Sequence, residues 1–177
     1  ELGRSLEFGT GIQEDLEQAV KWYRSAAEQD HAPGQCCLGF CYESGRGVEQ
    51  SWEEAVKWYR AAADQNYPRA QCNLAWCYEY GKGVEQDYTA AVKLYRAAAD
   101  QEYPRGQLCM GFCCERGRGV PLNKKEAAEW YSKAAEQGDY KGLAFNHWVG
   151  PQLLQFCYRV IPTVAVLYLG QNLATDI

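Results

Sequence analysis

Nine cysteines are the residues of this 177-residue chain that are most able to do chemistry. Three of them, Cys41, Cys77 and Cys113, stand 36 residues apart, a spacing that suggests a ladder of thiols for binding a metal or forming disulfides. The competing interpretation is that they are small buried side chains. Adjacent repeats usually hold such positions farther apart than a disulfide tolerates. With only two histidines and no Cys-x-x-Cys pair, zinc is not expected, so the sequence favours buried thiols and predicts no metal or other cofactor.

The cysteine count also bears on the compartment. The number is odd, so complete pairing within one chain is impossible, and no Asn-x-Ser/Thr sequon occurs. Both observations favour the cytoplasm or another reducing compartment. No signal peptide is visible, but the chain starts without Met and inside a repeat, as expected of a fragment, so a missing signal carries little weight.

Glu43, Glu79 and Glu115 recur with the same spacing. They suggest either a carboxylate ladder for a cationic ligand or a solvated acidic face, and the sequence does not decide between the two. Catalytic motifs such as Ser-x-x-Lys, Gly-x-Ser-x-Gly and His-Glu-x-x-His do not occur. Gly45-x-Gly47 and its copies lack a third glycine and follow a helix rather than a strand, so they predict turns and not a phosphate-binding loop. We therefore expect no catalytic residues and no enzyme.

A 36-residue repeat positions all of these side chains. An aromatic or leucine residue followed by Tyr, and then a pair of alanines, marks each copy at Trp22-Tyr23, Trp58-Tyr59, Leu94-Tyr95 and Trp130-Tyr131. Such a period is typical of solenoids built from helical pairs. We expect a repeat domain over residues 1–142, with repeats at about 1–30, 31–66, 67–102 and 103–138, and then a non-repeat tail over residues 143–177.

Each repeat reads as two helices, called helix A and helix B below. Helix A is expected to begin near Pro33, Pro68 or Pro104. It should end at a Gly-x-Gly-Val turn, because glycine there can adopt positive φ. Helix B follows an N-cap residue type, at Asp15, Ser51, Asp87 or Asn123. Glu54 and Glu126 are placed to complete capping boxes with Ser51 and Asn123.

Helical geometry divides helix A into two faces. In the third repeat, the expected core residues are Ala70, Leu74, Cys77, Tyr78 and Gly81. The paired alanines of helix B and either Trp58 or Tyr59 should pack against them. The opposite face repeats an aromatic residue at positions 40, 76 and 112, and such a pattern calls for a partner or a second layer. The predicted partner-binding residues on that face are Cys36, Phe40, Glu43, Arg69, Cys72, Trp76, Glu79, Tyr80, Arg105, Leu108, Phe112, Glu115 and Arg116.

One repeat of this pattern resembles the Sel1-like repeat. The resemblance rests on Ala70-Gln71, Leu74-Ala75, Tyr78, Gly81 and Gly83-Val84, and on Ala55, Trp58-Tyr59 and Ala62-Ala63 of the preceding helix B. This family is a subclass of the tetratricopeptide-like proteins. The resemblance covers about residues 2–142. It implies an all-α, right-handed α/α superhelical solenoid of about four helix-turn-helix repeats. It also implies a scaffold or adaptor role, with helix A lining a concave groove.

One branch of that family, the cysteine-rich Helicobacter proteins, departs from this pattern. In its members, disulfides join helix A to helix B, and a β-lactamase-like activity has been suggested for them. The bridging cysteine follows the helix B alanines, where this chain has Glu28, Asp64, Asp100 and Glu136. Every repeat cysteine here lies on helix A, so this bridge is not expected. A β-lactamase-like protein, and a secreted or surface protein that binds host or cell-wall ligands, are kept as alternatives.

Charge and the tail complete the prediction. The net charge of −5 and the pI near 5.1 argue against a nucleic-acid partner.

In the tail, Arg159 and Pro162 interrupt the apolar run, so a membrane span is not expected. Because the end of a solenoid exposes apolar surface, we predict that residues 143–177 cap the fourth repeat. Occupation of the groove, self-association or disorder are the alternatives. The predicted function is non-enzymatic binding of a protein or peptide on the helix A face.

Overall fold

The computed structural model describes residues 15–137, which form seven α-helices and no strand. Helix A of the repeat corresponds to α3 (Ala32–Ser44), α5 (Pro68–Tyr80) and α7 (Pro104–Arg116). Helix B corresponds to α2 (Leu16–Glu28), α4 (Trp52–Asp64), α6 (Tyr88–Asp100) and α8 (Lys124–Glu136). This alternation confirms the expected all-α repeat solenoid.

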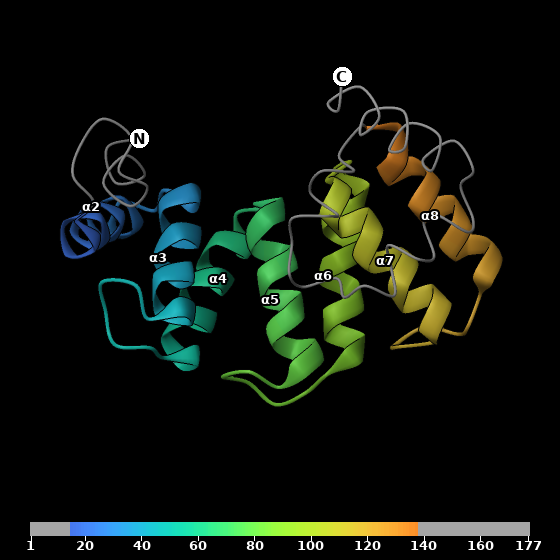
Figure 1. Ribbon diagram of the computed structural model, residues 1–177, viewed down its shortest axis with the longest axis horizontal. Coiled ribbons are helices and arrows are strands. Elements are labelled where there is room, and N and C mark those ends of the chain that lie inside the picture. Colours follow the sequence, from blue (N-terminus) through green and yellow to red (C-terminus); the bar gives the residue numbers. More distant parts are fainter. Residues whose placement is uncertain (1–14, 138–177) are drawn as a thin grey trace, which may run out of the picture.

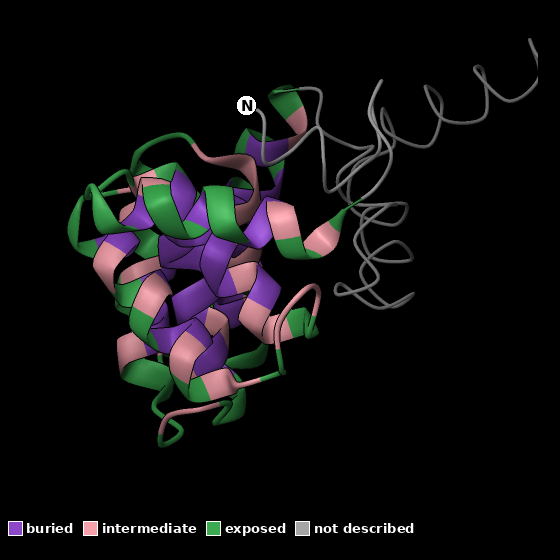
Figure 2. Cartoon of the chain, turned by 90° about the vertical axis from the view of Figure 1, so that its left-hand side faces the viewer, coloured by how far each residue is buried: buried purple, intermediate pink, exposed green. Residues whose placement is uncertain are grey.

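The helices follow one another in chain order along the long axis of the molecule (Figure 1). Each helix packs against the helices before and after it, and α5 also contacts α7. The buried residues accordingly form a series of clusters along the row of helices rather than one central core. Figure 2 shows these buried residues between the helices, with the exposed residues on the outer turns.

Helix A ends where the sequence predicts, because a glycine adopts the left-handed conformation there. The C-cap residue Gly81 has φ +63°, and its N–H donates to the carbonyl oxygen of Cys77. Gly45 and Gly117 end α3 and α7 in the same way. A side chain with a Cβ adopts this conformation only at a cost, which explains why glycine recurs at this position.

Helix B begins at the predicted N-cap residues. The Oγ of Ser51 accepts a hydrogen bond from the N–H of Glu54 at 3.2 Å, and the Oδ1 of Asn123 accepts one from the N–H of Glu126 at 3.2 Å. The first turns of α4 and α8 therefore have an acceptor for one of their unpaired N–H groups. Asp15 and Asp87 cap α2 and α6 in the same manner.

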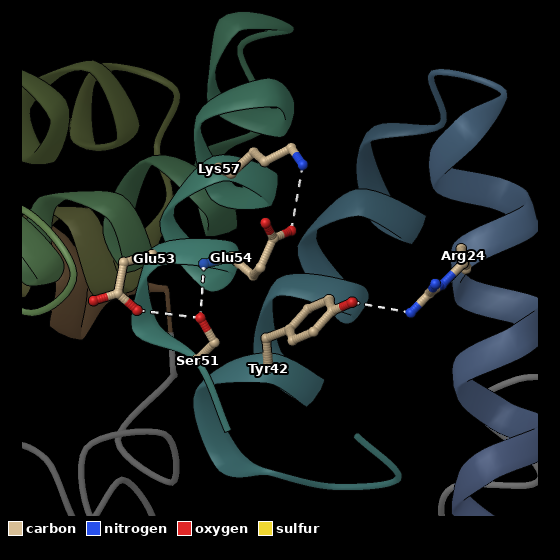
Figure 3. A network of polar contacts seen from close by, with 6 residues as sticks. All are labelled: Arg24, Tyr42, Ser51, Glu53, Glu54 and Lys57. Carbon is tan, nitrogen blue, oxygen red and sulfur yellow. Dashed lines mark hydrogen bonds and ion pairs between the residues drawn. The ribbon is translucent and has the colours of Figure 1, made fainter. Parts of the chain in front are cut away.

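The other half of the predicted capping boxes is wrong. The N–H of Ser51 donates to the carbonyl oxygen of Tyr42 at 3.0 Å, and the carboxylate of Glu54 pairs with Lys57 at 3.3 Å instead (Figure 3). The end of helix A, and not a glutamate side chain, thus supplies the acceptor for this N–H group. The same figure shows Arg24 of α2 donating to the hydroxyl of Tyr42 of α3 at 2.9 Å, across a repeat boundary.

The core prediction for the third repeat is confirmed in part. Three of the five residues are buried: Ala70, Leu74 and Cys77. Tyr78 is only half-buried, because its hydroxyl reaches the surface and accepts a hydrogen bond from Arg60 at 2.9 Å, and Gly81 is exposed at the helix end. Of the two helix B aromatics, Tyr59 is fully buried and Trp58 is half-buried.

The paired alanines of helix B allow the next helix A to approach closely, as predicted. A Cβ added at Gly106 of α7 would lie 2.8 Å from the Cβ of Ala98 and 2.7 Å from the backbone nitrogen of Ala99. Both distances are shorter than the normal contact distance between non-bonded heavy atoms. Small residues on both helices are therefore a condition for stacking one repeat on the next.

The predicted tail, residues 143–177, lies outside the described residues, and so does its expected capping of the fourth repeat. Within residues 15–137, the helices are too short or too polar for any of them to cross a membrane.

Candidate binding face on helix A

The thirteen predicted binding residues all lie on helix A, but they divide by burial. Four are buried: Cys36, Cys72, Glu79 and Leu108. The expectation of an outward placement is wrong for these four, because each helix A is covered by its own helix B and also by helices of the neighbouring repeats. Cys72, for example, belongs to the same core cluster as Tyr95 of α6 and Leu108 of α7.

The other nine reach the surface to different extents. Three are exposed: Arg69, Tyr80 and Arg116. Six are half-buried: Phe40, Glu43, Trp76, Arg105, Phe112 and Glu115. The surface side of helix A is therefore a narrow strip of side chains rather than half of each helix.

The three glutamates of the predicted acidic ladder each accept a hydrogen bond from a tyrosine hydroxyl of the same repeat. The pairs are Tyr59–Glu43, Tyr95–Glu79 at 2.9 Å and Tyr131–Glu115 at 3.1 Å. We call these three pairs the Glu–Tyr seam. Its carboxylates join helix A to helix B, a role that the sequence did not reveal.

Burial sets the protonation of the seam. It is the largest cause that raises the pKa of Tyr95 well above its usual value, with smaller contributions from Cys109 and Glu79. Tyr95 therefore keeps its proton at neutral pH and stays a hydrogen-bond donor. Burial likewise raises the pKa of Glu43, while the hydrogen bond from Tyr59 and the nearby arginines lower it.

A second repeated contact joins the C-terminal end of helix B to helix A. The side-chain amide of a C-cap glutamine donates to a buried glutamine of helix A in each pair: Gln65 to Gln35 at 2.8 Å, Gln101 to Gln71 at 2.9 Å and Gln137 to Gln107 at 3.0 Å. Together with the Glu–Tyr seam, these bonds fix the orientation of α3, α5 and α7. The surface side chains on these helices therefore project from a defined frame.

Aromatic side chains cluster where α5 meets the start of α4. The centroid of the Trp76 ring lies 5.3 Å from that of Trp52 and 5.1 Å from that of Tyr80. The ammonium group of Lys82 lies 5.8 Å from the centroid of Trp52, within the range of a cation–π interaction. Trp76 therefore contacts the preceding repeat as well as its own helix.

Arginines continue this cluster onto α7. The ring of Phe112 has two guanidinium groups near it, with Cζ of Arg118 at 5.0 Å and Cζ of Arg116 at 5.7 Å from the centroid. Nη1 of Arg118 donates to Oε1 of Glu79 at 2.8 Å. Burial raises the pKa of Tyr80, and Arg118 lowers it. The bond to Glu79 is the largest cause that raises the pKa of Arg118.

These contacts involve residues of the second, third and fourth repeats, and Arg118 of the fourth repeat reaches Glu79 of the third. We call this set of residues the aromatic–cation strip, and it consists of Trp52, Trp76, Tyr80, Lys82, Phe112, Arg116 and Arg118. Sequence reasoning missed Trp52, Lys82 and Arg118 because it considered helix A alone. The signal was present, since a basic residue recurs between the two turn glycines of the second, third and fourth repeats, as Arg46, Lys82 and Arg118, whereas the first repeat has Thr10 there.

The other two predicted arginines lie at the opposite ends of α5 and α7. Nη1 of Arg105 donates to Oδ1 of Asn73 at 2.9 Å, so this side chain spans from α7 to α5. Nδ2 of Asn73 in turn lies 3.8 Å from Sγ of Cys36 on α3. Arg69 is exposed and lies close enough to Glu43 to lower the pKa of that carboxyl. Arg105 therefore serves contacts between repeats, whereas Arg69 also faces solvent.

The eight described cysteines all lie on helix A, and no disulfide joins any two of them. Cys41, Cys77 and Cys113 are buried, which confirms their interpretation as small core residues. Burial raises the pKa of the Cys36 and Cys77 thiols to about 12 in each case, so both stay protonated at neutral pH. Among residues 15–137, no group of three His, Cys, Asp or Glu side chains is placed to hold a metal ion.

Comparison with protein families assigns the repeats. The model described as "Sel1 repeat" matches residues 1–31, 32–67, 68–103 and 104–139. A second model, "PTS system sorbose-specific iic component", matches residues 124–177, a range that overlaps the last Sel1 match and mostly lies outside the described residues. A search of curated proteins gave no match.

Solved structures with the same architecture include a Sel1 repeat protein from Oxalobacter formigenes, at 37% identity and a TM-score of 0.74, covering 77% of this chain and 55% of that one. The protective antigen c5321 of uropathogenic Escherichia coli is 44% identical, with a TM-score of 0.73, and the match covers 77% of this chain and 29% of that one. Cysteine rich protein B of Helicobacter pylori is 27% identical, with a TM-score of 0.56, covering 73% and 95%. The chain thus spans about half of the first protein and under a third of the second.

Proposed function

Because this chain belongs to the Sel1 repeat family, whose members generally mediate protein–protein interactions, we propose that it is a non-enzymatic adaptor. Its binding surface is the helix A side, formed by α3, α5 and α7 and by the loops that follow them. The ligand is a protein or an extended peptide. The observation that carries this proposal is the aromatic–cation strip, whose members come from three successive repeats.

Three features support the helix A side. α5 and α7 contact one another directly, in keeping with an inner, concave position for helix A. The buried seam holds each helix A in place, so that ordering of the surface costs little upon binding. Large aromatic side chains and arginines, which dominate protein interfaces, gather there: Tyr80 is 46% exposed, and Arg116 is exposed beside it in the strip.

Site-specific photocrosslinking tests which side binds. p-Benzoylphenylalanine would replace Tyr80 on the helix A side or Lys93 on α6 of the same repeat, and a third variant would carry it in place of Trp22 on α2, which has the same exposed fraction of 46%. Each variant must keep the helicity of the wild type. After irradiation in a lysate, crosslinked partners are identified by mass spectrometry. We expect crosslinks from position 80 and not from positions 22 and 93.

Crosslinks from positions 22 or 93 alone would contradict the proposed side, since those residues lie on helix B.

The proposed absence of enzymatic activity has its own test. In the described residues every cysteine lies on helix A, so a disulfide from helix A to helix B cannot form among them, and a β-lactamase-like protein is not supported. Turnover of nitrocefin by the purified chain would overturn this part of the proposal.

A further inference from the structure

Helices α3, α5 and α7 with their glycine turns have a surplus of basic residues although the chain is acidic; the acidic residues Glu49, Glu85 and Asp87 lie farther along the loops. Helices α3, α5 and α7 and the Gly-x-Gly-Val turns after them contain six basic residues and three acidic ones, while the whole chain has a net charge of −5. The basic residues are Arg46, Arg69, Lys82, Arg105, Arg116 and Arg118. Positive charge is therefore concentrated in the helices and turns that carry most of the aromatic–cation strip.

The three acidic residues within these helices and turns are Glu43, Glu79 and Glu115, the members of the Glu–Tyr seam. Each already accepts a hydrogen bond from a tyrosine hydroxyl, and Glu79 is only 5% exposed and also pairs with Arg118. Their carboxylates therefore hold the repeats together. What a ligand meets beside the aromatic rings is the cationic groups, above all Lys82 and Arg116, which are exposed.

The structure assigns a partner chemistry to this surface, an inference that rests on the proposed function: the aromatic–cation strip binds an extended acidic peptide segment that also carries apolar side chains. Carboxylates of the segment pair with Lys82 and Arg116, and its apolar side chains pack on Trp76, Tyr80 and Phe112. Charge complementarity of this kind sets specificity and the rate of association. The negative charge elsewhere on the chain repels the same segment, which fixes its position at the strip.

Aromatic rings next to arginines also occur in proteins that bind single-stranded nucleic acid, where bases stack on open ring faces. Here the rings contact one another instead. Trp76 lies between Trp52 and Tyr80, with interplanar angles of 39° and 38°, and Phe112 has two guanidinium groups near it. The acidic chain also lacks the surplus of basic residues typical of nucleic-acid binding. These observations favour a peptide.

The test measures binding of three synthetic peptides to the ¹⁵N-labelled chain, followed through the indole N–H signals of Trp52 and Trp76. The peptides share the same alternating Phe and Leu residues and differ in the residues between them, which are Glu and Asp, Gln and Asn, or Lys. The strip variant is Lys82→Glu/Arg116→Glu. The matched control is Lys21→Glu/Lys93→Glu, which changes the net charge equally at exposed positions of α2 and α6. Arg118 stays unchanged because it pairs with the buried Glu79.

We expect the acidic peptide to bind more tightly than the neutral one and to lose at least about tenfold in affinity with the strip variant, but less than about twofold with the control. Salt should weaken this binding. If the acidic peptide fails to bind, or if it binds both variants equally, the inference is wrong. Binding of an oligo-dT strand that is lost in the strip variant would overturn the assignment of a peptide.

The outcomes also separate this inference from the proposed function. Crosslinks from position 80 together with an unchanged affinity of the strip variant would leave the adaptor role in place and remove the acidic partner. Crosslinks from helix B alone would remove both.

Discussion

The Glu–Tyr seam and the aromatic–cation strip lie on the same helices, yet they differ in how strictly they repeat. The seam has the same two residue types in all three described helix pairs. At the strip, equivalent positions change from one repeat to the next, as in the series Ser44, Tyr80 and Arg116. Every repeat must hold its two helices together, whereas an exposed edge is free of that requirement. Variation among the repeats of one chain therefore separates the residues that build the solenoid from those that shape its surface.

The two regions meet at one residue. Glu79 accepts hydrogen bonds from Tyr95 of the seam and from Arg118 of the strip. Lys82, which occupies the position of Arg118 one repeat earlier, lies over the ring of Trp52 instead. The residues of the strip thus vary between repeats, but the strip is joined to the constant seam at Glu79. Substitutions in each region can therefore be compared by their effects on stability.

The largest effect is expected where the loop that carries Lys82 rests on the preceding repeat. Gly83 has φ +67°, and a Cβ there would lie 2.4 Å from the backbone carbon of Trp52. Gly83→Ala should therefore lower the free energy of unfolding by about 3 kcal/mol or more, because it adds a backbone clash to the cost of positive φ. The measurement is the urea midpoint followed by circular dichroism.

Gly81→Ala is the matched control for this change. Gly81 has φ +63°, but the nearest atom to its added Cβ is 3.5 Å away, so only the conformational cost of about 1 kcal/mol applies. Equal losses for the two variants would show that the loop moves away from Trp52 without penalty. In that case the contact between repeats would not hold the strip in place.

A smaller effect should distinguish the seam from the strip directly. Tyr95→Phe removes a buried hydroxyl and leaves Glu79 without one of its two donors, which should cost about 1–3 kcal/mol of unfolding free energy. Tyr80→Phe removes a hydroxyl at a residue that is 46% exposed, and it should cost no more than about 0.5 kcal/mol. Chemical denaturation of both variants provides the measurement, and a larger loss at position 80 would reverse our assignment of the two regions.

The sequence predicts the frame of this molecule well, because the frame repeats. Periodic glycines, N-cap residues and alanine pairs mark the helix ends and the close contacts, and the structure places Gly81, Ser51 and Ala98 in those roles. The candidate site is predicted less well. A helical projection treats each helix A as having two faces, so it placed Cys72 and Leu108 outward, although helices of neighbouring repeats cover them.

The seam and the strip escaped prediction for the same physical reason. Both depend on contacts between segments that are far apart in sequence, such as Tyr95 with Glu79 and Arg118 with Glu79. The spacing of residues along one helix carries no information about these distances. For Glu79 in particular, the sequence suggests either a ligand-binding carboxylate or a solvated charge, and only the packing of α6 and of the loop after α7 shows that it is buried.

The smallest effect concerns the charge of the seam. Burial raises the folded-state pKa of Glu43 above its usual value, so the folded chain binds a proton more readily than the unfolded chain between those two values. In that window stability rises as the pH falls. Glu43→Gln keeps an acceptor for Tyr59 and lacks this titration. As the pH is lowered from 7 to 5, the unfolding free energy of the wild type should therefore rise relative to that of the variant. Paired urea titrations provide the measurement. The other carboxylates titrate in both proteins, so their effects cancel when the unfolding free energy of the variant is subtracted from that of the wild type. If this difference stays constant with pH or falls as the pH falls, the arginines near Glu43 outweigh its burial and its charge favours folding.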